Sequence, residues 1–208
     1  MKRSEKLALF LGMLSGDGCL PIHHNGKGYR DYAVQFYNTN KDRVELFNRL
    51  FLDIFGVNGT IGYCDRLGKQ RLWSFCKYSK KITEEIRNWG FPEGVKRDVL
   101  RVLPIVFKGT NSEKLEFIRG VLITDGCVRK NETIIFHSGS ELFLNDLSDL
   151  IGDIIGIRKP IKEYVQREKY KSFQLNLNKK ESALLLSDLK DKPTWDNGTP
   201  IALSFKTR

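Results

Sequence analysis

The chain contains one sequence pattern twice. Residues 4–19, SEKLALFLGMLSGDGC, return as residues 112–127, SEKLEFIRGVLITDGC, at an offset of 108 residues. Nine of the sixteen aligned positions are identical, whereas chance would supply about one. The chain is therefore a duplicated unit, and its fold must contain two copies of one arrangement.

The similarity continues beyond this pattern, but at a different offset. Phe36, Leu50 and Gly56 match Phe136, Leu150 and Gly156 at an offset of 100 residues. The second copy has thus lost eight residues, which fall in the polar loop around residues 23–28 of the first copy. Further on, the Ser-Phe pair at 74–75 aligns with the pair at 172–173, at an offset of 98 residues.

Periodicity and turn residues predict the same order of elements in each half: helix, hairpin, helix, hairpin, helix. The first copy should have helices at 4–16 and 46–55 and strands at 32–38, 60–65 and 70–78. The second should have helices at 140–155 and 179–189 and strands at 127–130, 133–138, 160–167 and 170–177. We expect an N-terminal repeat at 1–93, a connector at 94–111 and a C-terminal repeat at 112–208.

Charge and cysteine content narrow the class of protein. There are 35 Lys and Arg against 25 Asp and Glu, which gives a formal charge of +10 and favours a polyanionic partner. Four cysteines without a CxxC pair suggest free thiols in a reducing compartment rather than disulfides or zinc. The apolar run at 7–14 is far shorter than the ~20 residues that span a bilayer. We expect an intracellular protein, in the cytoplasm or an organelle matrix with access to DNA, and no membrane partner.

One predicted strand alternates between apolar and amide side chains. Phe173, Leu175 and Leu177 should face one way, and Gln174 and Asn176 the other. A sheet face rich in amide and basic groups suits the DNA major groove, where such groups read base edges. The alternative is a solvated face with no partner. Similar mixtures in 31–38 and 70–78 favour DNA.

The repeated helix ends on Asp-Gly in both copies, at Asp17 and Asp125. Each helix also carries small residues four apart, Gly12 with Gly16 and Gly120 with Thr124, a spacing that lets two helix backbones approach closely. If the helices pair in parallel, the two carboxylates emerge side by side, where they oppose each other and the negative helix ends. A divalent cation would resolve both conflicts, and oxygen ligands favour Mg²⁺ or Ca²⁺ over zinc.

Residues 10–18, FLGMLSGDG, and 118–126, IRGVLITDG, resemble two degenerate copies of the motif that names the LAGLIDADG family of homing endonucleases. The resemblance extends over nearly the whole chain, because the element order and the connector fit the single-chain, two-motif type. It implies an α+β fold of two duplicated αββαββα lobes related by a pseudo-two-fold axis. The motif helices would pair at the interface, and two antiparallel four-stranded saddle sheets would lie along the DNA.

The resemblance also implies roles for motif residues. Asp17 and Asp125 match the catalytic acid that binds the divalent metals, and Gly16 and Thr124 match the preceding residue, whose backbone carbonyl commonly joins the coordination. Gly12 and Gly120 match the helix interface. Relatives often have a Gln-Lys pair after the second strand, where this chain has residues 38–41, NTNK, and 137–140, HSGS. No central lysine is therefore assigned, and Lys41 and Lys108 are the candidates.

The DNA-contacting residues should lie on the strands and hairpins. Candidates are Lys27, Arg30, Gln35, Tyr37, Arg66, Arg71, Lys77, Arg129, Lys130, Arg167, Gln174 and Asn176.

The resemblance predicts a homing endonuclease that hydrolyses both strands of a long double-stranded DNA target and leaves short 3′ overhangs. Such a metal-dependent phosphodiester hydrolase would serve intron or intein mobility and act as a monomer. Mg²⁺ would be its cofactor, with Ca²⁺ or Mn²⁺ substituting in binding or cleavage. The alternatives are a splicing maturase that binds intron RNA, or a DNA-binding regulator without nuclease activity. Neither needs paired acids at helix ends, so Asp17 and Asp125 favour the enzyme.

Overall fold

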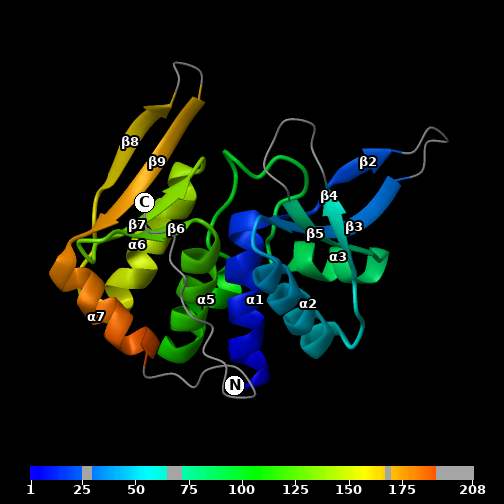
Figure 1. The fold of residues 1–208 in the computed structure, drawn as a ribbon, viewed down its shortest axis with the longest axis horizontal. Coiled ribbons are helices and arrows are strands. Elements are labelled where there is room, and N and C mark those ends of the chain that lie inside the picture. Colours follow the sequence, from blue (N-terminus) through cyan, green and yellow to red (C-terminus); the bar gives the residue numbers. More distant parts are fainter. Residues whose placement is uncertain (25–29, 65–71, 167–169, 191–208) are drawn as a thin grey trace.

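Two lobes flank a central pair of helices, α1 (Arg3–Asp17) and α5 (Asn111–Thr124), in the computed structural model, which describes residues 1–24, 30–64, 72–166 and 170–190 (Figure 1). The first lobe adds β1 (Gly18–Cys19), β2 (Ile22–His24), β3 (Arg30–Asn38), α2 (Lys41–Phe55), β4 (Thr60–Cys64), β5 (Leu72–Tyr78) and α3 (Lys80–Asn88). After a short helix α4 (Pro104–Phe107), the second adds β6 (Gly126–Val128), β7 (Ile134–Ser138), α6 (Glu141–Ile155), β8 (Ile161–Gln166), β9 (Tyr170–Leu177) and α7 (Lys179–Lys190).

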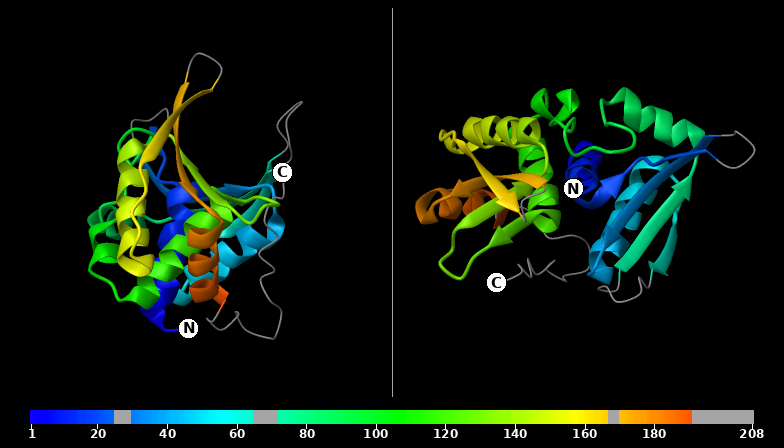
Figure 2. Two further views of the ribbon diagram at one scale, coloured as in Figure 1. Left: turned by 90° about the vertical axis from the view of Figure 1, so that its left-hand side faces the viewer. Right: turned by 90° about the horizontal axis from the view of Figure 1, so that it is seen from above.

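Each lobe has one antiparallel sheet. The strand order is β1-β3-β5-β4 in the first, where β2 also pairs with β3, and β6-β7-β9-β8 in the second. β1 and β2 pair with successive parts of β3 and therefore share one position in the first sheet. Each sheet thus has four strand positions. The sheets lie on either side of the paired helices when the molecule is seen from above (Figure 2). The predicted α+β fold with two antiparallel four-stranded sheets is confirmed.

The strand register corrects one predicted alignment. Phe36 pairs with Phe75 in the first sheet, and Phe136 pairs with Leu175 in the second. The two hairpins are therefore equivalent at an offset of 100 residues, and the alignment of 74–75 with 172–173 is wrong. That alignment was off by two residues, which leaves every side chain on the same sheet face. Alternation in the sequence could not reveal it.

The eight additional residues of the first repeat extend one hairpin. In β2, Ile22 pairs with Tyr32 and His24 with Arg30, beyond the end of β1. In the second repeat the hairpin closes earlier, through a backbone hydrogen bond from Arg129 to Thr133. The β2–β3 hairpin of the first repeat is therefore longer than the β6–β7 hairpin of the second.

The core differs in character between the lobes. In the first it is aromatic: Phe36 stacks on Phe47 at 4.3 Å between ring centroids, and Phe10 lies 4.9 Å from Phe47. In the second it is mainly aliphatic, with Phe117 and Phe143 6.4 Å apart. These side chains determine which face of each sheet is buried. The apolar face packs on α2 or α6, and the opposite face is open.

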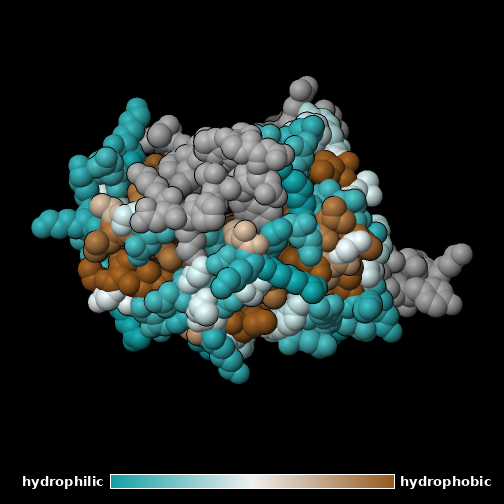
Figure 3. Space-filling model, turned by 90° about the horizontal axis from the view of Figure 1, so that it is seen from below, coloured by the Kyte–Doolittle hydropathy of each residue, from teal (hydrophilic) through white to brown (hydrophobic). Residues whose placement is uncertain are grey.

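The two helices that cover the sheets begin and end with the same kinds of capping residue. The Asn40 side chain accepts the Asp42 N–H at the start of α2, and the Ser140 hydroxyl accepts the Phe143 N–H at the start of α6. Gly56 and Gly156 end these helices in the left-handed region, at φ of 72° and 74°, which glycine adopts without strain. Among the described residues, no helix has both the length and the hydrophobicity to cross a membrane. Seen from below, the surface shows hydrophilic side chains between separate apolar patches (Figure 3).

Asp146 of α6 attaches the connector to the second lobe. Its carboxylate is mostly buried and accepts hydrogen bonds from Arg101 Nε at 3.0 Å, Arg101 Nη2 at 2.8 Å and the Val102 N–H at 3.1 Å. A buried charge of this kind is costly when its partners are mismatched. The connector is thus held in one position against α6.

We expect Asp146→Ala to lower the free energy of unfolding by about 2 kcal/mol, because it leaves the Val102 N–H without its acceptor and removes the paired charge. Asp149 of the same helix provides a matched control, since it forms a half-exposed pair with Arg158 at 3.4 Å. Asp149→Ala should change stability by less than about 0.5 kcal/mol. Equal losses in urea denaturation of the two variants would show that Asp146 does not anchor the connector.

Candidate functional site

The two motif helices touch through their glycines. A Cβ atom at Gly12 would lie 2.1 Å from the Phe117 carbonyl oxygen, and one at Gly120 would lie 2.5 Å from the Leu9 carbonyl oxygen. Only glycine fits such a backbone approach. Farther along, a Cβ at Gly16 would meet Thr124 Oγ1 at 2.0 Å, so the helices run in parallel and reach their C-terminal ends together.

The two motif acids lie at these ends. Asp17 is the last residue of α1, and Asp125 is the C-cap of α5. A Cβ at Gly16 would be 3.4 Å from Cγ of Asp125, so the Asp125 carboxylate packs against the residue that precedes Asp17. Both acids are partly exposed. The predicted pair of carboxylates is thus brought together between the two sheets.

Asn38 holds the Asp17 carboxylate. Its amide Nδ2 donates to Asp17 Oδ2 at 2.5 Å, and its own Oδ1 accepts the Asn40 N–H at 2.8 Å. The second contact fixes which end of the amide faces the acid. Arg43 of α2 also lies in the electrostatic range of Asp17: burial lowers the pKa of Arg43, and the Asp17 charge opposes that shift. Neither contact was predicted from the sequence.

Lys96, in the connector, lies at the end of α1 and was not among the lysines considered from the sequence. Its ammonium donates to the carbonyl oxygens of Ser15 at 2.6 Å, Gly18 at 2.7 Å and Leu14 at 3.2 Å, and also to that of Gly16. Burial lowers the pKa of Lys96, and the charges of Asp125, Asp17 and Cys19 oppose the shift. No local signal in the sequence pointed to this contact, because the last turns of α1, α2, α5 and α6 all lack a basic residue.

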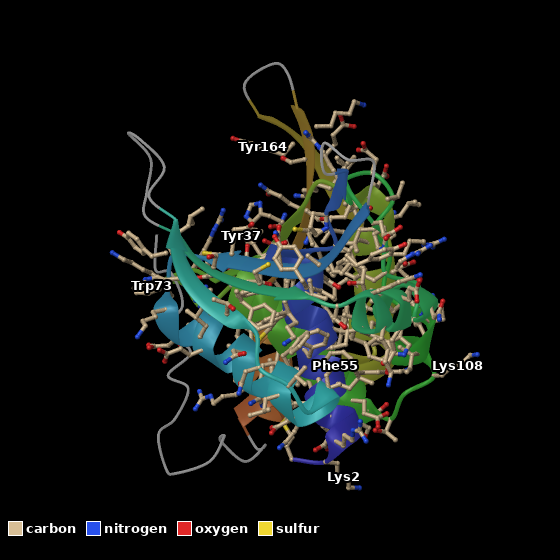
Figure 4. The ribbon with its side chains drawn as sticks, turned by 90° about the vertical axis from the view of Figure 1, so that its right-hand side faces the viewer. Lys2, Tyr37, Phe55, Trp73, Lys108 and Tyr164 are labelled. Atoms are coloured by element: carbon tan, nitrogen blue, oxygen red, sulfur yellow. The ribbon has the colours of Figure 1, made fainter. Side chains whose placement is uncertain are left out.

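The two predicted lysine candidates lie elsewhere. Lys41 pairs with Glu45 at 2.9 Å and lies over the Trp73 ring, 5.2 Å from its centroid. Lys108 is exposed at the end of α4 and lies at the edge of the molecule in Figure 4, away from Tyr37. Neither is among the groups around the acids.

The Asp125 side of the site opens into a pocket. Thr124 and Asp125 line it from the helix end, Gly126, Cys127, Ile135 and His137 line it from β6 and β7, and Arg129 lines it from the hairpin between these strands. The His137 N–H donates to the Asp125 carbonyl oxygen at 3.2 Å. The Thr124 hydroxyl donates back to the carbonyls of Gly120 and Val121, which holds this side chain against its own helix.

The open face of each sheet adjoins the acids and is polar. In the first sheet, Gln35 is in register with Cys19 and Cys76, and Tyr37 is in register with Ser74. In the second, Gln174 is in register with both His137 and Lys162, and Asn176 is in register with Ile135. Four predicted DNA-contacting residues therefore lie on open faces: Gln35, Tyr37, Gln174 and Asn176.

The remaining eight predicted contacts divide into four groups. Lys77 is in register with the buried Val34, so it lies on the face that packs against the helices and is not one of the residues on the open faces. Arg129 and Lys130 are exposed on the β6–β7 hairpin. Arg30 begins β3. The other four lie outside the described residues: Lys27, Arg66, Arg71 and Arg167.

The donors present suit a hard divalent ion. Two carboxylates and backbone carbonyls offer only oxygen, which Mg²⁺ and Ca²⁺ prefer. In the described part of the chain, no three His, Cys, Asp or Glu side chains form a metal-binding group. Two carboxylates would leave positions for water and phosphate oxygens, as is usual for Mg²⁺. Cys19, Cys76 and Cys127 are free thiols.

One family model and two DNA polymerases are similar in sequence to this chain. A family model for the LAGLIDADG-like domain matches residues 112–188. The chain is also similar to DNA polymerases of Thermococcus aggregans, with 21% identity over 154 residues, and Thermococcus kodakarensis, with 26% over 150 residues. These matches cover 74% and 72% of this chain but only 8% of each polymerase.

Solved structures share the fold over nearly the whole chain. The homing endonuclease I-DmoI in complex with DNA and Mn has a TM-score of 0.70 and 18% identity, covering 92% of this chain and 99% of that one. The homing endonuclease I-WcaI bound to its DNA recognition sequence has a TM-score of 0.59 and 15% identity, covering 91% and 82%. The predicted resemblance to the single-chain, two-motif LAGLIDADG proteins is thereby confirmed.

Proposed function

We propose that this two-motif LAGLIDADG protein is a site-specific homing endonuclease. It would hydrolyse both strands of a long double-stranded DNA target, leave short 3′ overhangs, and so promote intron or intein mobility. The observation that carries this proposal is the pair of carboxylates at the ends of parallel helices, between two open polar sheet faces. A protein that only binds DNA needs the faces but has no use for the pair of acids.

In the proposed reaction, the residues of the open faces position the DNA, and the two acids hold the divalent ions. The open faces would lie along the DNA and bring a phosphodiester of each strand to Asp17 or Asp125. Divalent ions bound there would activate the attacking water and stabilise the leaving 3′ oxygen. Asn38 keeps the Asp17 carboxylate oriented, and the contact of Gly12 with Gly120 sets the separation of the two acids. Precise separation matters because both scissile phosphates must fit one rigid centre.

The comparisons support the choice of metal and partner. Structures of I-DmoI contain DNA with Ca or with Mn, and a structure of an I-DmoI variant contains its target DNA in the presence of 2 mM Mg. We therefore propose Mg²⁺ as the cofactor, with Ca²⁺ or Mn²⁺ as substitutes, and double-stranded DNA as the partner of a monomeric chain in a DNA-containing intracellular compartment. Polymerase activity is not proposed, since the chain spans 8% of those relatives.

The direct test is to incubate the protein with Mg²⁺ and DNA that spans its own insertion site, with the intervening sequence removed. We expect double-strand cleavage near that site and no cleavage in EDTA. Binding without cleavage would favour a DNA-binding regulator. A requirement for the chain in splicing of the intron RNA, without DNA cleavage, would favour a maturase.

Lys162 should contribute to DNA binding through the phosphates. Its register with Gln174 places it on the open face of the second sheet, whereas Lys77 lies on the helix-packed face of the first. Lys162→Ala should make the slope of log K against log salt shallower by about 0.9, the value for one lost phosphate contact. Lys77→Ala should leave the slope unchanged. The opposite result in a fluorescence anisotropy titration would show that the faces are wrongly assigned.

A further inference from the structure

The Gln35 side chain has polar neighbours on three sides on the open face of the first sheet. Gln35 lies within β3, in register with Cys19 of β1 on one side and with Cys76 of β5 on the other. Tyr37 lies two residues further along β3 and therefore on the same face. Phe36, between them, is fully buried on the opposite face. Gln35 thus faces the side of the sheet that DNA would occupy.

The carbonyl oxygen of the Gln35 amide accepts two hydrogen bonds. The Tyr37 hydroxyl donates to Gln35 Oε1 at 3.0 Å, and the Cys19 thiol donates to the same oxygen at 3.8 Å. Burial raises the pKa of the Cys19 thiol, so at neutral pH this thiol keeps the proton that it donates. Since a carbonyl oxygen has two lone pairs, the acceptor of this amide is already used within the protein.

The amide nitrogen of Gln35 can still donate to DNA. Nε2 carries two hydrogens and directs one of them to Cys76 Sγ at 3.9 Å. The reverse orientation of the amide is disfavoured, because a phenol hydroxyl is a better donor than acceptor and a thiol sulfur is a weak acceptor. The first sheet therefore presents a hydrogen-bond donor at this position, and not an acceptor.

The second sheet has no amide at the equivalent position. Phe36 and Phe136 are equivalent in the two sheets, so the counterpart of Gln35 is Ile135, which is buried. Ile135 is in register with Cys127 and Asn176. A base contact by Gln35 would therefore occur in one half-site and have no counterpart at the same position in the other.

We propose that Gln35 reads a guanine in the half-site bound by the first sheet, as a hydrogen-bond donor in the major groove. Guanine presents two acceptors there, N7 and O6, whereas adenine presents N7 beside an amino group that is itself a donor. A glutamine with both amide groups available would instead favour adenine, because it pairs with both of these groups. Cys19 follows Asp17 by two residues, so this guanine should lie within about five base pairs of the nearer scissile phosphate. The inference rests on the proposed recognition of double-stranded DNA.

The first test is selection of bound duplexes from libraries of the insertion site in which one base pair at a time is randomised. EDTA is present, so that the DNA stays intact. At one position the wild type should select guanine over adenine by at least about fivefold, and Gln35→Ala should lose this preference. Adenine at the position that depends on Gln35, or identical selection by the two proteins, would overturn the inference and leave the endonuclease function intact. If the wild type selects no base at any position, site-specific recognition fails, and the proposed function fails with it.

Tyr37→Phe tests the orientation of the amide. It returns one lone pair to Gln35 Oε1, so the side chain can offer an acceptor together with a donor. The ratio of adenine to guanine at the same position should rise at least about threefold. Tyr63→Phe is the matched control, since it removes a hydroxyl from a tyrosine that lies against Trp73 on the helix-packed face of the same sheet. It should select as the wild type does, and an unchanged ratio in Tyr37→Phe would count against the inference.

A further measurement uses only the wild-type protein, so it stands even if a variant fails to fold. Inosine keeps the N7 and O6 acceptors of guanine and lacks its amino group in the minor groove. In fluorescence anisotropy titrations, inosine at the selected position should bind within about twofold of guanine, and adenine at least about fivefold more weakly. Binding of inosine as weak as that of adenine would place the contact in the minor groove and contradict the proposal.

Discussion

Replacing either Asp17 or Asp125 with Asn will abolish double-strand cleavage while leaving DNA affinity within about tenfold, or roughly 1.4 kcal/mol. Each carboxylate lies at the end of its helix and is not one of the strand side chains that would read the bases. Asparagine keeps the shape of the side chain and removes the charge that holds a divalent ion. We expect the rate of double-strand cleavage to fall at least about 1000-fold in single-turnover assays.

Asp53 and Asp153 provide matched controls for these substitutions. They occupy equivalent positions in the two repeats and form partly exposed ion pairs with Lys6 and Lys114, both at 2.7 Å. Asp53→Asn and Asp153→Asn should cleave within about threefold of the wild type, since surface pairs contribute little. Wild-type cleavage by Asp17→Asn and Asp125→Asn in Mg²⁺ would show that the site is assigned to the wrong acids.

Gly120→Val will lower the free energy of unfolding by about 3 kcal/mol, at the upper end of the range for overpacking. Even the Cβ atom would lie 2.5 Å from the Leu9 carbonyl oxygen and 2.7 Å from the Met13 nitrogen. These neighbours are backbone atoms, so they can yield only if the helices separate. Cleavage should fall further than stability does, because separation of the helices also separates Asp17 from Asp125.

Gly62→Ala is the corresponding control for stability. A Cβ there would meet only Ser74 Oγ, at 3.3 Å, and a serine hydroxyl can rotate away. We expect a change of less than about 0.5 kcal/mol in thermal or urea denaturation. A Gly120→Val protein that unfolds like the Gly62→Ala protein would exclude close contact between the motif helices.

The duplicated sequence was sufficient to predict the architecture. Two copies of one pattern, each followed by alternating and helical periodicities, determine the order of elements and the pairing of the motif helices. Gly12 and Gly120 could be placed at the interface because each is followed four residues later by another small residue. This spacing has few other roles in a helix than close packing against a second helix. Asp17 and Asp125 then follow as neighbours, since they end helices that run in parallel.

Other features depend on contacts between segments that no local pattern relates. Lys96 is one of 35 Lys and Arg residues, and only the path of the connector brings it to the end of α1. Lys77 could be assigned to its sheet face only from the pairing with Val34, because the strand sequence around it mixes polar and apolar residues on both faces. Asn38 begins the stretch of residues 38–41 that follows the second predicted strand. Its hydrogen bond to Asp17 could not be predicted, because this bond depends on where β3 ends.

The most direct measurement of the central claim is a time course of Mg²⁺-dependent cleavage of the insertion-site duplex, with a different fluorophore on each strand. The wild type should cut both strands at defined positions offset to give short 3′ overhangs, and a protein with Asp17→Asn and Asp125→Asn together should bind the duplex without cutting either strand. Intact strands after incubation of the folded, DNA-bound wild type with Mg²⁺ would contradict the assignment of this chain as an endonuclease.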